Sequence, residues 1–480
     1  MKTAPWTARI CMGIAASIAA LSAHASTDAS AMTDYLDDNY QRYAGIARTI
    51  WESAELGYQE TESSNLLQKT LRDAGFSVES GVAEIPTAFV ASYGQGEPVI
   101  GLLAEFDALP GISQTDSPFR EIRQDRNAGH ACGHHLFGAG STAAAIAVKQ
   151  WMADNDVPGT IRLYGTPAEE GGSGKVYMVR AGLFDDVDAV LDWHPASLNS
   201  ANPSTSLANK SAKFRFYGVS AHAAASPEKA RSALDAVEAM NFMANMMREH
   251  VPQETRIHYV ITSGGSAPNV VPDFAEVFYY VRHPKAETLK GLWERVMATA
   301  DAAAIGTGTT LKAEVIHGNH SLLPNTVLAR ALHANLTTVG GVDYDAQERA
   351  FANRIDETLN NDRDITGWES TIQPFEEELG MGSTDVGDVS WRVPTAGVRT
   401  ATWVPGTSAH SWQAIAAGGT SIGYKGMMVA AKTLALTAAQ LFQQPDTLAQ
   451  ARAEYEERIG PDFEYEALLG DRDPPLDYRK

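Results

Sequence analysis

Three near-continuous apolar runs constrain the fold of this chain most, because each predicts a strand buried on both faces. The runs are VIGLLAEF (99–106), TIRLYG (160–165) and DAVLDW (188–193). They lack the alternation of a half-exposed strand, and strands of this kind belong to parallel sheets that helices cover on both sides. A stretch of small apolar residues at 136–154 predicts a helix between the first two. We therefore expect an α/β fold with a doubly wound, mainly parallel sheet.

The pattern changes after Pro203. Segments 211–224, 256–265 and 275–283 predict strands, and 232–250 and 288–304 predict helices. Two helices against an antiparallel sheet make an α+β unit, which we place at residues 206–318. Apolar helical segments such as 420–442 then return to the first style. We expect this unit to be inserted into a first domain made of residues 26–205 and 319–480.

The first residues predict a targeting segment. Lys2 and Arg9 precede a short apolar run at 10–22, and Ala23, His24 and Ala25 form a small-x-small cleavage site. The run is too short to span a membrane. We expect a signal peptide at residues 1–25 and a periplasmic or secreted protein.

Charge and cysteine content narrow the function. The net charge is −21, which argues against nucleic acid or an anionic membrane as a partner. Of the two cysteines, Cys11 would leave with the signal peptide, so the mature chain keeps only Cys132. An exported thiol is prone to oxidation unless a metal holds it as the thiolate. The histidines around Cys132 favour that interpretation over an inert buried cysteine.

Residue types typical of metal ligands follow the predicted strands or lie near them. They are Cys132, His134, Glu170, His194 and His410, and a second carboxylate, Glu169, precedes Glu170. Open α/β sheets build their sites at the carboxyl ends of strands. Thiolate, imidazole and carboxylate together suit Zn²⁺ or Mn²⁺. In a Glu-Glu pair, one carboxylate can hold metal while the other moves a proton, which points to metal-assisted hydrolysis.

From about Tyr35 to Phe442 the chain resembles an amidohydrolase family that includes hippurate hydrolase, auxin-conjugate amidohydrolases, aminoacylases and carboxypeptidase G. Each motif alone is weak, and their order makes the set specific. The motifs are FDALPG, HACGHHLFG, PAEEGGSGK, DVDAVLDWHP, VSAHAA, SPEKARSALDAV, APNVVP, GSTDVGDVSW and SAHSWQ.

The resemblance implies two divalent metal ions per subunit, Zn²⁺ or Mn²⁺, with Cys132 as a bridging ligand and Glu169 as the general base. It also implies that the inserted domain makes a dimer and carries His222 to the partner's site, where it stabilises the oxyanion. Asn269 and Arg282 match positions that bind substrate carboxylate. The residues alone leave alternatives open: a histidine among alanines is often structural, and Arg282 could be a surface strand residue.

Other polar residues have no settled role. Many relatives have Asp where this chain has His135, so His135 either supports a ligand or marks a different metal preference. Asp107 could orient a ligand histidine or cap a turn. We expect Asp385 and Asp388 to make loop hydrogen bonds.

The expected activity is hydrolysis of the amide bond of an N-acyl amino acid, such as the N-aroyl compound aminobenzoyl-glutamate, by metal-activated water. Two alternatives stay open. The chain could be a non-catalytic or regulatory subunit of a hetero-oligomeric amidohydrolase, or a related aminopeptidase or dipeptidase. The partner would be an identical or a homologous subunit.

Overall fold

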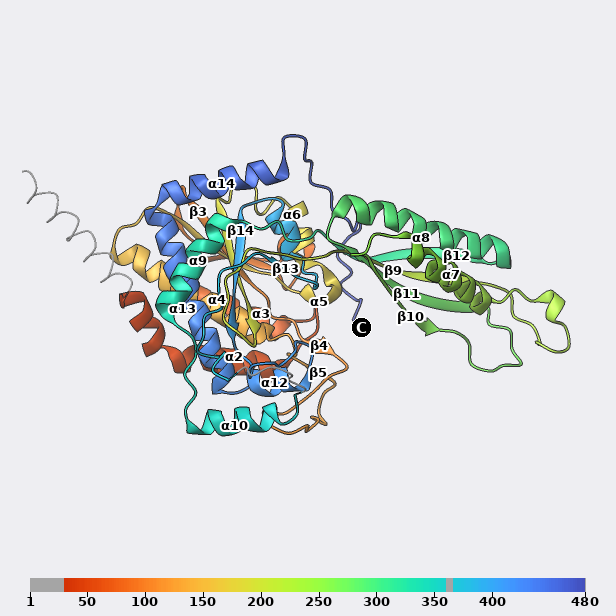
Figure 1. The fold of residues 1–480 in the computed structure, drawn as a ribbon, viewed down its shortest axis with the longest axis horizontal. Helices are drawn as coiled ribbons and strands as arrows, with labels where there is room; N and C mark the ends of the chain where they lie inside the picture. The colour runs from red at the N-terminus through yellow and green to blue at the C-terminus, as the bar shows by residue number, and fades with distance from the viewer. Residues whose placement is uncertain (1–29, 360–365, 480) are drawn as a thin grey trace, which may run out of the picture.

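The computed structural model describes residues 30–359 and 366–479, so the predicted signal peptide at 1–25 lies outside the described residues. The chain forms two layered units, each with its own sheet (Figure 1). No helix among the residues described is long and apolar enough to cross a membrane.

The large sheet has the strand order β1-β2-β6-β3-β7-β14. Strands β6, β3, β7 and β14 are parallel, whereas β1 and β2 add an antiparallel edge. All residues of β3 are buried, as its unbroken apolar sequence predicts. The predicted α/β class is confirmed. The strands are β1 (Ser77–Ser80), β2 (Phe89–Gln95), β3 (Val99–Ala104), β6 (Gly159–Gly165), β7 (Ala189–Ala196) and β14 (Thr395–Ala401).

Two long helices, α4 (His134–Asp154) and α13 (Ser421–Gln443), pack on each other and on this sheet. Helix α4 carries small residues that permit close approach: a Cβ at Gly138 would lie 2.8 Å from the Glu105 carbonyl oxygen. Helix α4 begins at His134, two residues earlier than the sequence predicts. The remaining elements of this unit are α2 (Tyr40–Ser53), α3 (Thr61–Asp73), β4 (Leu109–Pro110), β5 (Ala128–Gly129), α5 (Glu169–Gly172), α6 (Gly174–Arg180), β8 (Ser204–Thr205), α9 (Thr326–Val339), α10 (Ala346–Asp356), β13 (Glu378–Leu379), α11 (Val386–Ser390), α12 (Trp412–Gly418) and α14 (Pro445–Ile459).

The smaller unit is an antiparallel sheet in the order β10-β11-β9-β12, with two helices packed on it. Burial alternates strictly along β11, because the helices cover one face only. Its elements are β9 (Ala208–Tyr217), α7 (Ala233–Met247), β10 (Arg256–Ser263), β11 (Phe274–His283), α8 (Ala286–Thr307) and β12 (Thr310–Asn319). The sequence analysis missed β12 and extended the first strand too far, since β9 ends at Tyr217.

The two units have separate hydrophobic cores. The elements of the smaller one run from Ala208 to Asn319. The division into domains at residues 206 and 318 stays a prediction.

Candidate metal centre

A tight turn delivers Cys132 and His134 to the carboxyl edge of the large sheet. Gly133 has φ +80°, and a Cβ on it would lie 2.6 Å from the Pro195 side chain at the end of β7. Both facts require glycine here. His134 is then the first residue of α4, and Pro195 follows His194 on the neighbouring strand. The turn therefore brings all three candidate ligands together.

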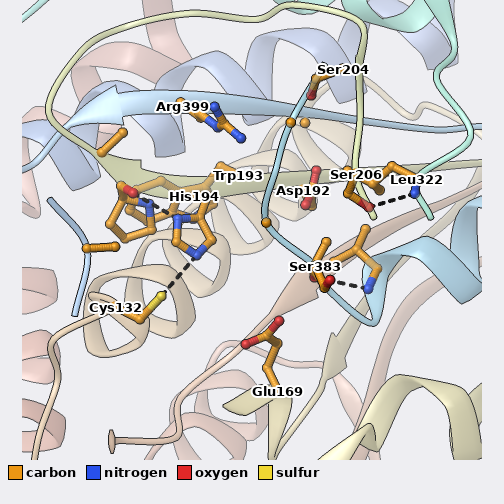
Figure 2. A pocket seen from close by; sticks show the side chains of 18 of the residues that line it. Cys132, Glu169, Asp192, Trp193, His194, Ser204, Ser206, Leu322, Ser383 and Arg399 are labelled. Carbon is orange, nitrogen blue, oxygen red and sulfur yellow. Dashed lines mark hydrogen bonds between the residues drawn. The ribbon is translucent and has the colours of Figure 1, made fainter. Parts of the chain in front are cut away.

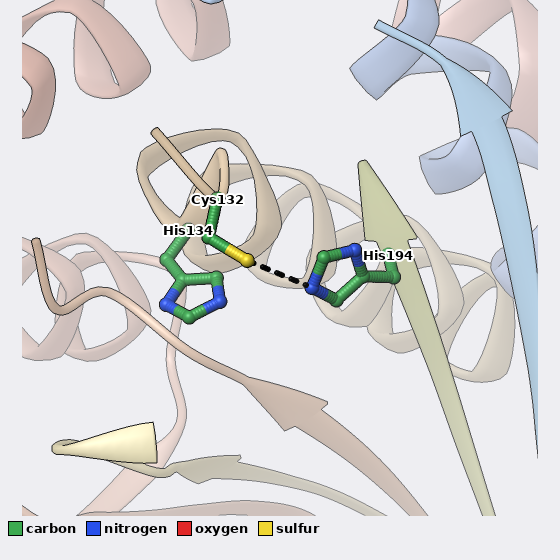
Figure 3. A group of neighbouring side chains, drawn as sticks. All are labelled: Cys132, His134 and His194. Carbon is green, nitrogen blue, oxygen red and sulfur yellow. Dashed lines mark hydrogen bonds between the residues drawn. The ribbon is translucent and has the colours of Figure 1, made fainter. Parts of the chain in front are cut away.

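The first donor group is Cys132, His134 and His194, whose ligand atoms lie within 4.8 Å of one another (Figure 3). The Cys132 Sγ is 3.5 Å from Nε2 of His194. The other ring nitrogen of His194 donates to the Pro195 carbonyl oxygen at 2.8 Å, which leaves Nε2 for a metal. Burial lowers the pKa of His194 to about 4, so the imidazole is neutral.

The second donor group is Cys132, Glu170 and His410. Nε2 of His410 lies 3.1 Å from Oε1 of Glu170. His410 has φ +62°, an unusual backbone angle for a non-glycine residue, and its N–H donates to the Ala131 carbonyl oxygen at 2.9 Å. Because Cys132 belongs to both groups, its thiol lies between two ligand sets.

Buried carboxylates orient these ligands from behind. Oδ1 of Asp107 accepts from Nδ1 of His134 at 2.9 Å, and Oδ2 accepts from the backbone N–H of Glu170 at 2.9 Å. Glu60 accepts the backbone N–H of Ala168 at 2.8 Å and so fixes the turn before Glu169. Asp107 therefore orients a ligand histidine, the first of the two roles considered from sequence.

The donor set fits divalent metal ions. Nε2 of His134 and Oε1 of Glu170 are buried, and neither makes a hydrogen bond of good geometry among the described residues, although a charged neighbour lies close to each. Such orphaned polar atoms are rare and need a partner. Thiolate, imidazole and carboxylate are what Zn²⁺ prefers. The residues present therefore suit a metal, and they do not distinguish Zn²⁺ from Mn²⁺.

Glu169 lies beside these ligands and lines the same cavity as Cys132 and His194 (Figure 2). Burial, together with the negative charges of Glu105 and Glu170, raises the pKa of Glu169 well above its ordinary value. A carboxylate with a raised pKa next to metal ligands is suited to accept a proton.

The structure adds a buried ion cluster that the sequence analysis missed. Nζ of Lys175 is 2.6 Å from Oε1 of Glu105 and 2.6 Å from Oδ1 of Asp385, and all three side chains are buried. Burial alone would lower the pKa of Lys175, but Asp385 and Glu105 outweigh it and raise the pKa above its ordinary value. The other Glu105 oxygen is 3.0 Å from Nε2 of His134. A charged residue inside each apolar segment was the available signal.

The ligands open into a cavity of about 830 Å³ between the two units. Arg282, at the end of β11, lines it, and its side chain donates only a long hydrogen bond, 3.4 Å, to Ser383. No carboxylate lies within 4 Å of Arg282 among the residues described. An unpaired guanidinium beside metal ligands is suited to a substrate carboxylate.

Two predicted site residues lie elsewhere. His222 and Val270 form a bridge beyond the far ends of β9 and β11, and the Asn269 carbonyl oxygen accepts from Ala223. Asn209, the partner of Arg282, is eight residues before Tyr217, which is about 26 Å at roughly 3.3 Å per residue. His222 and Asn269 therefore cannot reach Arg282 within one chain.

The remaining candidates have local roles. His135 is buried, donates from Nε2 to the Gly418 carbonyl oxygen at 2.9 Å and is in neither ligand group. Asp388 accepts from the His320 backbone N–H and the Tyr465 hydroxyl.

A doubly wound sheet with buried thiol, imidazole and carboxylate groups at its carboxyl edge defines a metal-dependent hydrolase. The sequence profile described as "Peptidase family M20/M25/M40" matches residues 101–414. This chain belongs to that family.

Similar proteins agree with this assignment. A p-aminobenzoyl-glutamate hydrolase component from Escherichia coli, one of that enzyme's subunits, is 41% identical over 452 residues, 88% of this chain and 94% of that protein. A mouse Xaa-Arg dipeptidase is 29% identical over 436 residues, 88% of this chain and 90% of that protein. A solved Bacillus subtilis protein, described as a dinuclear metal-binding peptidase of the family, has 19% identity and a TM-score of 0.56, covering 85% of this chain and 99% of its own.

Replacing Glu60 by glutamine should flatten the pH dependence of stability. Burial, then the charge of Asp107, raises the pKa of Glu60 from 4.5 to about 8. The folded chain then keeps a proton that the unfolded chain loses, so this stabilisation is complete below pH 4.5 and is lost as the pH rises towards 8. Denaturant unfolding of metal-free protein should show the wild type losing on the order of 2 kcal/mol more than Glu60→Gln between about pH 5 and pH 8. The exposed Glu62→Gln is the control, and parallel profiles for Glu60→Gln and the wild type would contradict the assignment.

Replacing Cys132 by serine should lower metal content, because a hydroxyl does not ionise as a thiol does. Cys132→Asp should retain more metal, since a carboxylate is also an anionic ligand. The measurement is metal per subunit by elemental analysis after equal dialysis. Equal content in wild type and Cys132→Ser would make Cys132 a structural cysteine.

Proposed function

We propose that this chain hydrolyses the amide bond of an N-acyl amino acid, with an N-aroyl compound such as aminobenzoyl-glutamate as the best candidate. The observation that carries the proposal is the shared cavity. It joins Cys132, Glu169 and His194 to the unpaired guanidinium of Arg282. The carboxylate of the amino acid can bind at Arg282 while the amide lies over the ligands. The similarity to a p-aminobenzoyl-glutamate hydrolase component supports this substrate class.

In this proposal the chain's residues divide the work. Cys132, His134 and His194 hold one metal ion, and Cys132, Glu170 and His410 hold a second. The two ions, Zn²⁺ or Mn²⁺, would supply Lewis-acid activation of water and of the amide carbonyl when bound. Glu169 takes the proton from the attacking water and returns it to the leaving nitrogen, which its raised pKa favours. Asp107 keeps the His134 ring in place.

We further propose export through the signal peptide at residues 1–25, with a mature chain that starts near Ser26. N-terminal sequencing of the protein from a host periplasm is the test of this proposal.

Purified protein reconstituted with Zn²⁺ or Mn²⁺ should hydrolyse aminobenzoyl-glutamate. Glu169→Gln should keep its metal and lose ~10²–10⁴-fold in turnover, because the general base is gone. Release of aminobenzoate, followed by absorbance, is the measurement, and Xaa-Arg dipeptides are the competing substrates.

Two outcomes would overturn the proposal. Inactivity of the metal-loaded chain alone, with activity restored by a homologous subunit, would favour a non-catalytic role. Cleavage of dipeptides but of no N-acyl amino acid would favour the dipeptidase alternative.

His222 should act in the partner's site, since it lies about 26 Å or more from Arg282 in its own chain. Losing an oxyanion donor typically costs ~10²–10³-fold in turnover, with little change in substrate binding. Glu169→Gln and His222→Ala, each inactive alone, should therefore complement one another when subunits exchange.

In a mixed dimer, one site is damaged twice and the other is intact. Random mixing of equal amounts should thus recover about a quarter of wild-type activity. No recovery despite proven exchange, followed by mass spectrometry of differently tagged subunits, would exclude a role for His222 across the interface.

A further inference from the structure

The segment that follows α14, residues 460–479, does not stay with that helix. It runs from the large unit to the junction of the two units and ends beside α5 (Figure 1). Leu468 is buried in the core of the smaller unit, and Leu469 is buried in the core of the larger one. The proposed function assigns no role to this segment.

Specific contacts fix its path. The Tyr465 hydroxyl donates to Oδ1 of Asp388 at 2.7 Å, and the Glu466 carbonyl oxygen lies 2.9 Å from Nε2 of His320. Further along, Arg180 donates to the Arg472 carbonyl oxygen at 2.7 Å. The segment is therefore anchored before it reaches the cavity.

Its last described residues pack against the metal-ligand turn. The Tyr478 hydroxyl donates to the Glu170 carbonyl oxygen at 3.2 Å, and its ring meets the edge of Tyr58, with 5.6 Å between centroids. A Cβ at Gly57 would lie only 2.3 Å from the Tyr478 oxygen. The chain thus leaves room for this tyrosine, which places the next residue, Arg479, at the cavity.

Arg479 lines the same cavity as Glu169, Glu170 and Arg282. One of its nitrogens donates to the Glu170 carbonyl oxygen at 2.5 Å. That bond uses one of five N–H donors. Among the residues described, no carboxylate lies within 4 Å of its guanidinium, as for Arg282. Two unpaired cations therefore face one cavity in a chain of net charge −21.

Tyr280 shows that the two cations act on the same region. Burial raises the pKa of its hydroxyl, and the charges of Arg479 and Arg282 both act in the opposite direction. The Arg282 guanidinium lies over the Tyr280 ring at 5.5 Å. A ligand bound next to Tyr280 would meet both guanidinium groups.

We propose that Arg479 is a substrate-binding residue that recognises the side-chain carboxylate of a dicarboxylic amino acid, while Arg282 binds the α-carboxylate. The inference rests on the proposed function, which it deepens by naming the substrate class. Two carboxylates on the ligand match two cations without internal partners, and the fork of each guanidinium suits bidentate binding. A monocarboxylic amino acid would leave one of the cations unpaired.

The test compares benzoyl-glutamate with benzoyl-glutamine, which has the same shape without the second charge. Arg479→Gln keeps an amide donor for the Glu170 carbonyl and removes the charge. It should reduce kcat/KM for benzoyl-glutamate by about 10- to 100-fold, mainly through KM, and leave benzoyl-glutamine nearly unchanged. Arg479→Lys should fall between, since it keeps charge without the fork. Arg472→Ala, a cation of the same segment that pairs with Glu314 outside the cavity, is the matched control.

Equal losses for both substrates, or losses in kcat and metal content, would overturn the proposal and give Arg479 a purely structural role at Glu170. No change for benzoyl-glutamate would overturn it too.

Binding provides a test that does not need turnover. Calorimetric titration of Glu169→Gln protein with both compounds should show a preference for benzoyl-glutamate, and Glu169→Gln with Arg479→Gln should lack it. If wild type hydrolyses neither compound but this preference exists and depends on Arg479, the proposed function fails and the binding site stands. If the parent shows no preference, the inference fails whatever the activity.

Discussion

The Asp107 carboxylate holds the ligand cluster together. Its two oxygens accept from the His134 ring and from the Glu170 backbone, which lie at the starts of α4 and of the turn after β6. Two segments far apart in sequence thus share one fully buried anion. Ordering of one ligand therefore depends on the other. A metal site needs this rigidity, because ligands held loosely cannot impose a geometry on the ion.

Below the ligands, the protein keeps a cation where water cannot reach. A lone buried lysine would be very costly, but Lys175 lies between Glu105 and Asp385, so its charge is balanced locally. The same Glu105 also approaches His134. The cluster thus connects the packing under the sheet to the charge of the site above it. The acidic surface and the cationic cavity are separate features: one keeps molecules apart, and the other attracts an anion.

The sequence predicted most of what depends on local pattern. Continuous apolar runs gave the buried strands, and polar residues at their ends gave the ligands, because the edge of a parallel sheet collects them. Contacts between distant segments could not be read in this way. That Lys175 is buried depends on Asp385, more than two hundred residues later, and nothing in GGSGK announces it. The place of Arg479 depends on the path of the segment after α14. Strand β9 was extended to His222 because alternation alone does not show where a strand loses its hydrogen-bonded neighbour.

Leu468 and Leu469 are neighbours in the chain, yet they are buried in different cores. Adjacent Cα atoms are about 3.8 Å apart, so the two units cannot separate at this point without pulling one leucine into water, which costs roughly 2 kcal/mol. Rotation about the joining peptide meets no such penalty. The pair is therefore a pivot: it permits one unit to swing over the cavity while fixing the axis about which it turns.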